Sequence, residues 1–353
     1  MNSYNVIGVM SGTSLDGIDI VYVNFKLKDY WRFNLINFKT YPYSNYWQNT
    51  LRDINQNPIT IIEKIDQNYT KFLANTIKNF INEFSISKID FVSSHGHTAV
   101  HDPSNLLTYQ LGNLPIISDY LKLKVICDFR TQDLKYGGQG APLVPVGEKY
   151  LFPEFESLIN LGGFANITKN NFNNLIAYDI CPVNIILNYI SNKAGLNYDD
   201  KGELASSGNM NMKLFNYLES LEYYKLESPK SLGIEWVRDK IFNNILKDST
   251  IPIKDLLYTF TYHMATQISK NINSEKQNLF TGGGVYNEFL IRQIKSLSNA
   301  EIIIPEAKII EFKEALIFGF LGVLRDLNIN NCYTSVTGAS KDHSSGKIFI
   351  NKV

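Results

Sequence analysis

Three glycine-rich turns are the part of this sequence best suited to hold a small ligand. They occupy residues 11–17, 161–166 and 281–287, and each follows a short apolar run typical of a buried strand. Glycine lets the backbone approach a ligand closely, and successive N–H groups in such turns form sites that bind anions. Any one turn of this kind is commonly just a tight connection. The three together predict a shared site for the phosphates of a nucleotide.

The turns match neither of the two best-known phosphate-binding motifs. The chain has no GxxxxGK[ST] string, and Gly282, Gly283 and Gly284 are spaced wrongly for GxGxxG. The hydroxyl groups of Thr13 and Ser14 add donors to the backbone N–H groups of the first turn. We therefore expect a nucleotide site of a different architecture.

The spacing of apolar residues predicts the elements that position these turns. Short alternating or continuous apolar runs predict strands, and apolar residues three and four apart predict helices. The expected strands cover residues 6–10, 18–25, 33–41, 91–95, 125–128, 158–161, 166–168, 175–179, 278–280 and 301–304. The expected helices cover residues 58–84, 182–194, 209–221, 234–246, 252–272, 312–327 and a segment that begins near residue 288. Together these elements predict an α/β protein.

The length of the chain predicts two domains. It has 353 residues, and domains average about 150 residues. A segment rich in glycine and proline, residues 136–145, breaks the pattern, so we place the change of domain just before it. The expected domains are residues 1–129 and 130–335, with residues from about 336 to 353 packing back on the first. Each half begins with strands joined by a glycine-containing turn.

Composition excludes several classes of protein. The chain carries 34 Lys and Arg against 34 Asp and Glu, and this balance argues against nucleic-acid binding. Cys127, Cys181 and Cys332 are too few and too widely spaced for a disulfide framework or a zinc knuckle. The start lacks a signal-peptide pattern, and no apolar run approaches the roughly 20 residues of a membrane span. We therefore expect a cytoplasmic protein without a membrane partner.

The opening string GVMSGTSLDGID, residues 8–19, resembles the signature of the anhydro-N-acetylmuramic acid kinases. Further matches to that family follow in the same order over nearly the whole chain. They are Ser94-His95-Gly96, His101 with Pro103, Gln110 with Gly112, residues 128–133, residues 137–145, residues 160–166, residues 282–287, Glu314-Ala315 and residues 336–339.

The resemblance implies both a fold and a reaction. The fold is the two-lobed actin-like, hexokinase-type ATPase architecture, with ribonuclease H-like lobes and ATP in the cleft between them. The reaction uses ATP, Mg²⁺ and water to convert 1,6-anhydro-N-acetylmuramic acid to N-acetylmuramic acid 6-phosphate in peptidoglycan recycling. Similar enzymes pair as homodimers.

The resemblance also places the catalytic base at Asp179. Opening the anhydro bridge is a glycosidic cleavage, which needs a carboxylate to activate water, while the leaving 6-oxygen takes the γ-phosphoryl group of ATP. Asp179 lies at the end of an expected strand, just before a helix. The alternative is that Asp179 merely caps this helix or its turn.

The residues that the resemblance assigns to ATP lie in the three turns. They are Gly12, Thr13, Ser14, Leu15, Asp16, Gly17, Ile18 and Asp19 in the first turn, Gly162, Gly163 and Asn166 in the second, and Gly282, Gly283, Gly284 and Asn287 on the adenosine side. Asp16 and Asp19 are expected to hold Mg²⁺ through water molecules. The alternative for Asp16 is an Asx-turn residue.

Arg130 is the expected ligand of the sugar carboxylate, because its planar guanidinium can bond both oxygens at once. The alternative is a structural ion pair with Asp128 or Asp133. His95 and His97, at a strand end, are expected either to contact the sugar or to act as structural hydrogen-bond donors. The expected sugar site is completed by Asp133, Gly137, Gly138 and Gln139.

The chain departs from the family pattern at two positions. Cys181 stands where most members have glycine, and a thiol at a helix N-terminus has a lowered pKa, so Cys181 is a candidate reactive cysteine. His97 stands where the family usually has glutamine. Two alternatives therefore remain beside the family reaction: a kinase of the same fold for another sugar, and an ATP-dependent binding module without catalysis.

Overall fold

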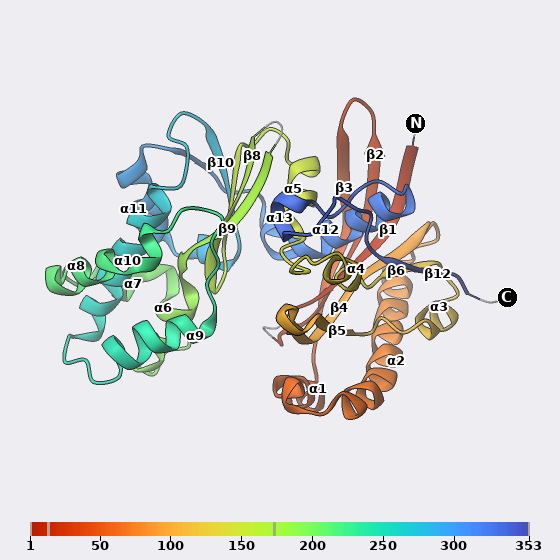
Figure 1. Cartoon of the computed structure of the whole chain (residues 1–353), viewed down its shortest axis with the longest axis horizontal. Coiled ribbons are helices and arrows are strands. Elements are labelled where there is room, and N and C mark those ends of the chain that lie inside the picture. Colours follow the sequence, from red (N-terminus) through yellow and green to blue (C-terminus); the bar gives the residue numbers. More distant parts are fainter. Residues whose placement is uncertain (1, 13–14, 172–173, 352–353) are drawn as a thin grey trace. The chain divides into compact units, whose positions relative to one another are not determined.

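A computed structural model describes residues 2–12, 15–171 and 174–351. It divides into two compact units: unit 1 comprises Met1–Phe152 and Phe312–Val353, and unit 2 comprises Pro153–Glu311 (Figure 1). The expected boundary at residue 129 lies inside unit 1. Helix α5 (Val144–Leu151) packs on strand β3 (Trp31–Pro42) of unit 1, and the ring of Phe152 lies edge-on to that of Phe33 in this strand. The chain therefore leaves unit 1 later than expected.

Unit 1 is built on a mixed sheet. Its strands are β1 (Asn2–Ser11), β2 (Gly17–Leu27), β3 (Trp31–Pro42), β4 (Phe91–Asp102), β5 (Leu107–Leu111), β6 (Val125–Cys127) and β12 (Lys347–Phe349). Their order is β12-β6-β4-β1-β2-β3, with β5 paired to β4. β1, β4 and β6 are parallel, and β2, β3 and β12 run antiparallel to their neighbours.

Helices of unit 1 cover both faces of this sheet. They are α1 (Asn45–Arg52), α2 (Ile59–Glu83), α3 (Ile116–Leu121), α4 (Thr131–Lys135), α5, α12 (Ala307–Asp326, in unit 1 from Phe312 on) and α13 (Thr334–Thr337). On one face, Tyr69, Leu73 and Ile77 of α2 share a core with alternate residues of β1, β2 and β4. On the other face, α12 lies so close to β1 that a Cβ atom at Gly8 would be 2.2 Å from the carbonyl oxygen of Ala315.

Unit 2 repeats the strand order of unit 1. Its strands are β7 (Ser157–Leu161), β8 (Phe164–Asn171), β9 (Asn174–Pro182), β10 (Gln277–Thr281) and β11 (Glu301–Ile303), in the order β11-β10-β7-β8-β9. β7, β10 and β11 are parallel, and the two hairpin strands are antiparallel. In both units the first strand, β1 or β7, has two antiparallel strands on one side and two parallel strands on the other. This order confirms the expected pair of ribonuclease H-like lobes.

The core of unit 2 lies between its sheet and its long helices. Leu257, Phe260 and Met264 of α10 pack with Ile159 and Phe280 of the sheet. The helical segments are α6 (Asn184–Asn192), α7 (Glu203–Ser206), α8 (Met212–Ser220), α9 (Ile234–Val237), a π-helical continuation (Arg238–Leu246), α10 (Ile253–Ser269) and α11 (Glu288–Ser298).

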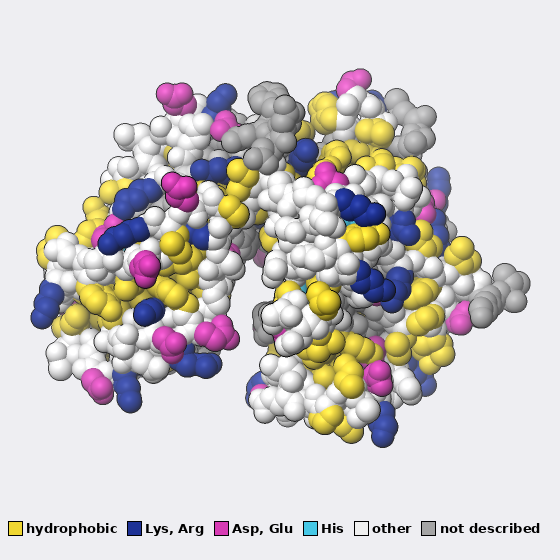
Figure 2. All heavy atoms as spheres, viewed as in Figure 1, with side chains coloured by type: hydrophobic (Ala, Val, Ile, Leu, Met, Phe, Trp, Pro, Cys, Tyr) yellow, Lys and Arg dark blue, Asp and Glu magenta, His cyan; other side chains and the backbone are white. Residues whose placement is uncertain are grey.

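The distribution of surface charges and the lengths of the helices can be described for both units. On the face drawn in Figure 2, basic and acidic side chains are interspersed over both units. Among the described residues, every helix is too short or too polar to cross a bilayer.

The contact of α12 with β1 predicts that Gly8 does not tolerate a methyl group. In Gly8→Ala the Cβ atom meets the backbone of α12, so helix and sheet must separate, and we expect a loss of about 2–3 kcal/mol in the free energy of unfolding. The measurement is denaturant unfolding followed by circular dichroism. Gly283→Ala is the control, because a Cβ atom there meets no atom within 4 Å. Equal stability of the two variants would contradict this packing.

Candidate functional site

The first expected phosphate turn is the hairpin between β1 and β2 in unit 1. Gly12 and residues 15–19 are described, whereas Thr13 and Ser14 lie outside the described residues. Gly17 has to be glycine, because a Cβ atom there would lie 2.4 Å from the carbonyl oxygen of Tyr41. The glycine therefore lets β3 pass directly beside the start of β2.

The two acidic residues of this hairpin offer oxygen atoms for a cation. Asp16 is exposed, and in the described part of the chain its carboxylate makes no Asx hydrogen bond. Asp19 Oδ1 accepts a hydrogen bond from Thr40 Oγ1 at 2.5 Å. Leu15 has φ +61°, and Ile18 is fully buried, so Ile18 offers a ligand only its backbone. Carboxylate oxygens of this kind suit Mg²⁺.

A buried network of side chains supports the end of β1. Ser11 Oγ lies 2.5 Å from Tyr43 Oη and accepts a hydrogen bond from Tyr69 Oη at 3.0 Å. His97 Nδ1 lies 3.1 Å from Ser11 Oγ. Burial lowers the pKa of His97 to about 4, so its imidazole is neutral near pH 7. The structural interpretation of His97 is therefore supported, and His97 also lines a pocket.

That pocket adjoins the hairpin in unit 1 and has a volume of about 260 Å³. Aliphatic, imidazole and amide side chains and a hydroxyl line it, so it offers both apolar walls and polar donors. The lining residues are Leu15, Leu51, Arg52, Ile54, Asn55, His97, Thr98, Ala99 and His101. Leu15 joins this pocket to the expected phosphate turn.

Arg130 is oriented by His95. Arg130 Nε donates to His95 Nε2 at 2.9 Å, and Nη1 donates to the carbonyl oxygen of Gly140 at 2.6 Å. His95 Nδ1 lies 2.8 Å from the carbonyl oxygen of Gly96, so it is the protonated nitrogen. Burial, assisted by the charge of Arg130, holds the pKa of His95 well below its usual range. His95 therefore positions Arg130 as a neutral acceptor.

The expected alternative for Arg130, an ion pair with Asp128 or Asp133, does not occur among the described residues. Asp128 is paired instead with Lys347, with Oδ2 and Nζ 2.7 Å apart. Asp19 and Arg130 both interact electrostatically with Glu314, an exposed residue of α12. Glu314 matched the family string in the sequence but was not assigned to the site there.

Asp133 supports a loop through its carboxylate. Its side chain is completely buried. Oδ2 accepts a hydrogen bond from the Gly140 N–H at 2.7 Å, and Oδ1 accepts one from Thr337 Oγ1 at 2.7 Å. The direct sugar contact expected of Asp133 stays a prediction, while the structure gives its carboxylate one backbone and one hydroxyl donor, partners that the sequence does not show.

The loop that Asp133 holds carries the other expected sugar residues. Gly137 and Gln139 are exposed, and Gly138 is buried against Asp133. A Cβ atom at Gly138 would lie 2.2 Å from Asp133 Oδ2. The N–H of Gln139 donates to the carbonyl oxygen of Thr337 at 2.8 Å. The loop is thus fixed by its backbone, while Gly137 and Gln139 face solvent.

The second and third expected phosphate turns meet in unit 2. β7 and β10 are adjacent parallel strands, and each ends in one of the turns, with Asn160 beside Thr281. A Cβ atom at Gly282 would lie 2.8 Å from Asn160 Oδ1, and one at Gly162 would lie 3.3 Å from Asn160 Nδ2. The side chain of Asn160, which the sequence analysis did not assign, therefore lies between the two turns.

Two exposed glycines in these turns have no packing reason to be glycine. A Cβ atom at Gly163 or at Gly283 meets no atom within 4 Å. Gly284, by contrast, packs against Leu161. The 3₁₀ turn Gly283–Tyr286 begins here, and the first N–H groups of a helical turn have no partner within it. Unpartnered N–H groups in a turn with open space beside its glycine suit the binding of a phosphate.

Asp179 lies on β9 opposite Asn166 of the second turn. A bulge in this pair, next to Ala165, interrupts the regular register. Asp179 Oδ2 accepts hydrogen bonds from the Leu232 N–H at 2.9 Å and from Ser231 Oγ at 3.2 Å. Its carboxylate does not cap α6, which has Val183 at its N-cap. The capping alternative is therefore wrong, since the carboxylate binds a distant segment instead.

That segment, residues 222–232, also holds the backbone of Asp179. The N–H of Asp179 donates to the carbonyl oxygen of Lys230 at 3.0 Å, and the carbonyl oxygen of Asp179 accepts a hydrogen bond from Tyr223 Oη at 2.5 Å. Burial raises the pKa of the Asp179 carboxyl, and the hydrogen bonds from Leu232 and Ser231 partly oppose this rise. A raised pKa makes the carboxylate a stronger base.

The other expected residues of unit 2 have structural partners. Asn287 caps α11, because its side chain accepts a hydrogen bond from the Leu290 N–H at 2.9 Å. Gly162 and Gly163 use their carbonyl oxygens to accept hydrogen bonds from the N–H groups of Asn184 and Val183, at 3.3 and 2.8 Å. The turn therefore caps α6 with its carbonyl groups.

Cys181 is a buried cysteine whose surroundings make its thiol unreactive. Its side chain is completely buried in the core of unit 2. Burial raises the pKa of its thiol well above the ordinary value, and the charge of Asp179 adds to this effect. The prediction of a reactive thiol is therefore wrong, because desolvation outweighs the helix N-terminus.

The family model and the named relatives of this chain indicate one family. The model of the anhydro-N-acetylmuramic acid kinase family matches residues 4–351. The anhydro-N-acetylmuramic acid kinase of Bacillus thuringiensis (strain Al Hakam) is 31% identical over 381 residues, which cover 99% of each chain. That of Sulfurimonas denitrificans is 32% identical over 366 residues, with 97% of this chain and 98% of the relative covered. The structure of xylulose kinase from Lactobacillus acidophilus matches with a TM-score of 0.44 at 11% identity, covering 99% of this chain and 94% of that one.

The burial of Cys181 predicts slow chemical modification. In the native protein, iodoacetamide should label Cys181 no faster than Cys127, which is equally buried, because alkylation requires an accessible thiolate. The measurement is a time course by peptide mass spectrometry, and labelling in denaturant serves as the control for complete reaction. Rapid labelling of Cys181 alone in the folded protein would contradict the described core.

Proposed function

This chain belongs to the anhydro-N-acetylmuramic acid kinase family, and from that premise we propose the reaction in detail. ATP, water and 1,6-anhydro-N-acetylmuramic acid give ADP and N-acetylmuramic acid 6-phosphate. Water attacks the anomeric carbon, the bond from this carbon to the 6-oxygen breaks, and the 6-oxygen takes the γ-phosphoryl group. The proton of the water passes to Asp179.

The observation that carries this proposal is the environment of the Asp179 carboxylate. One oxygen, Oδ2, is held by Leu232 and Ser231, and among the described residues no group donates a hydrogen bond to Oδ1. A fixed carboxylate with one oxygen open can orient a water molecule and accept its proton. The raised pKa of Asp179 supports this role.

We propose that the phosphates of ATP bind the glycine turns. A Cβ atom at Gly163 or Gly283 would meet no atom within 4 Å, so both positions have open space beside them, and the side chain of Asn160 lies between their turns. The hairpin at Gly12 and residues 15–19 contributes further N–H groups. Asp16 and Asp19 fit a Mg²⁺ ion by the chemistry of their oxygens; when bound, this ion neutralises phosphate charge.

For the sugar, we propose that Arg130 binds the carboxylate of the lactyl group. His95 and Gly140 hold two edges of the guanidinium and leave further N–H groups free to donate, since a guanidinium has five. Glu314 lies within electrostatic range of Arg130 and so stabilises its charge. The substrate would come from peptidoglycan turnover, and the enzyme would act in the cytoplasm. A homodimer stays a prediction.

Asp179→Asn tests the role of the base. An amide keeps the hydrogen bond from the Leu232 N–H but cannot take a proton, so we expect phosphosugar formation to fall about 10³-fold while ATP affinity is unchanged. Mass spectrometry of the product and calorimetric titration with a non-hydrolysable ATP analogue measure the two effects. Asp248→Asn, an exposed position in the same unit, is the control. Equal loss of turnover and ATP binding would make Asp179 structural.

The raised pKa of Asp179 predicts an acid limit on turnover. A base must be deprotonated to act, so kcat is lost as the pH falls through this pKa, above the ordinary value of 3.8. Ser231→Ala removes a hydrogen bond that lowers the pKa, so the acid limb should move to higher pH. The measurement is kcat against pH, with the exposed Ser220→Ala as control. A limb that stays in place would show that the hydrogen bond from Ser231 is not maintained in solution.

A further inference from the structure

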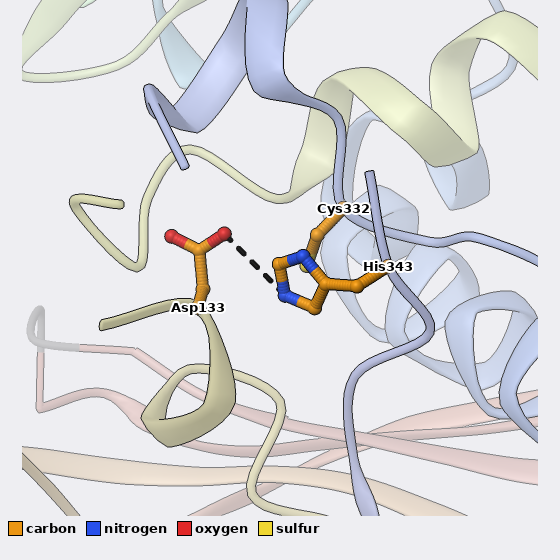
Figure 3. A group of neighbouring side chains, drawn as sticks. All are labelled: Asp133, Cys332 and His343. Carbon is orange, nitrogen blue, oxygen red and sulfur yellow. Dashed lines mark ion pairs between the residues drawn. The ribbon is translucent and has the colours of Figure 1, made fainter. Parts of the chain in front are cut away.

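We propose that Asp133, Cys332 and His343 form a binding site for a divalent transition-metal ion such as Zn²⁺ in unit 1. Asp133 belongs to α4, Cys332 follows α12, and His343 precedes β12. Figure 3 shows the carboxylate, the thiol and the imidazole pointing toward one another. Nothing in the proposed kinase reaction uses this cluster, so the inference stands apart from that reaction.

The backbone places two of the three ligands on the same side of a ribbon. Cys332 and His343 form an isolated antiparallel β-bridge, in which each N–H donates to the other's carbonyl oxygen at 3.1 Å. Side chains of directly opposed residues project to the same face. Asp133 comes about 200 residues earlier in the chain, and its carboxylate on α4 lies next to the imidazole of His343 on this face.

The separations of the ligand atoms suit one ion. The carboxylate oxygen, the thiol sulfur and the imidazole nitrogen all lie within 4.8 Å of one another. His343 Nε2 and Asp133 Oδ1 are 3.5 Å apart. A tetrahedral zinc site with bonds of about 2.0–2.3 Å has ligand separations of about 3.3–3.6 Å. The nitrogen and the oxygen already match, and the sulfur needs to move by about an ångström at most.

An unpartnered nitrogen points into the cluster. His343 Nδ1 lies 3.0 Å from the carbonyl oxygen of Lys341, so Nδ1 is a hydrogen-bond donor. His343 Nε2 then presents a lone pair, and it has no hydrogen-bond partner among the described residues. Its neighbour is the carboxylate of Asp133, another acceptor. A positive charge between these two buried acceptors, 3.5 Å apart, would satisfy both, and the sulfur beside them favours a metal ion.

The surroundings of the ligands resemble those of a prepared site. All three side chains are buried, and His343 is 5% exposed. The Lys341 carbonyl oxygen orients the imidazole, while Gly140 and Thr337 orient the carboxylate; such outer hydrogen bonds are typical of metal ligands. A thiolate and a carboxylate together neutralise a divalent ion, and Cys332 releases its proton when the ion binds.

Occupation of this site would stabilise the loop beside Arg130. Asp133 Oδ2 holds the Gly140 N–H, and Arg130 Nη1 donates to the Gly140 carbonyl oxygen. The ion would join α4 to the segment between α12 and β12, and would do so only in the folded chain. Three protein ligands leave one coordination position for a water molecule. We therefore assign the ion a structural role.

Titration of the metal-free full chain with Co²⁺ tests the proposal. Cobalt replaces zinc and gives a thiolate-to-metal absorption band in the near ultraviolet. We expect this band to saturate at one equivalent, to be lost in Cys332→Ala and to persist in Cys127→Ala, which removes the other buried cysteine of unit 1. Excess Zn²⁺, at about a hundredfold over its dissociation constant, should raise the melting temperature of the wild type by about 5 °C.

Three results would overturn the proposal. They are the absence of a thiolate band in the folded wild type, a band that survives in Cys332→Ala, and a wild-type melting temperature that Zn²⁺ does not change. The first would mean that only a proton bridges His343 and Asp133. If Cys332→Ala fails to fold, His343→Gln replaces it. Loss of the imidazole must weaken cobalt binding at least tenfold, because changes to the outer partners of metal ligands already weaken binding by about 10–100-fold.

Discussion

The proposed chemistry depends on a carboxylate that is tied at one oxygen and open at the other. Asp179 occupies a strand beside a bulge, and its side chain and both of its backbone polar groups are bonded to residues 222–232. A free aspartate at this depth would protonate or turn toward solvent, because burial disfavours its charge. The hydrogen bonds from Leu232 and Ser231 keep the anion in place. Unit 2 therefore owes its functional geometry to a segment whose regular structure is a short 3₁₀ helix, Glu222–Lys225.

The same strand order in both units explains why the functional turns lie where they do. In each unit the central strand ends in a hairpin turn, and the adjacent parallel strand ends beside it. Glycine serves two different purposes in this arrangement. Gly8 allows helix α12 to contact the sheet, whereas Gly163 and Gly283 are surrounded by open space. The first use builds the fold, and the second leaves room for a ligand.

Much of this organisation could be predicted from the sequence, and the exceptions share a cause. Alternating apolar residues predicted β2 and β3 closely, and three-and-four spacing predicted α2. Helix α12 begins at Ala307 rather than near residue 312, and its added first turns bury Ile309 and Ile310. Asp133 and Cys181 were assigned exposed roles but are completely buried. A motif fixes which residues lie together in the chain, whereas burial depends on partners such as Gly140 that come from the tertiary fold.

The contact between Gly8 and Ala315 has a consequence for how this protein is made. The core of unit 1 is completed by α12 and by β12, which pairs with β6. Both are synthesised after all of unit 2, so the first 152 residues leave the ribosome without the helix that covers one face of their sheet. Unit 2 has a contiguous chain and can fold during translation, whereas unit 1 must wait with an apolar face uncovered. The N-terminal sheet therefore reaches its final packing only after unit 2 has been synthesised.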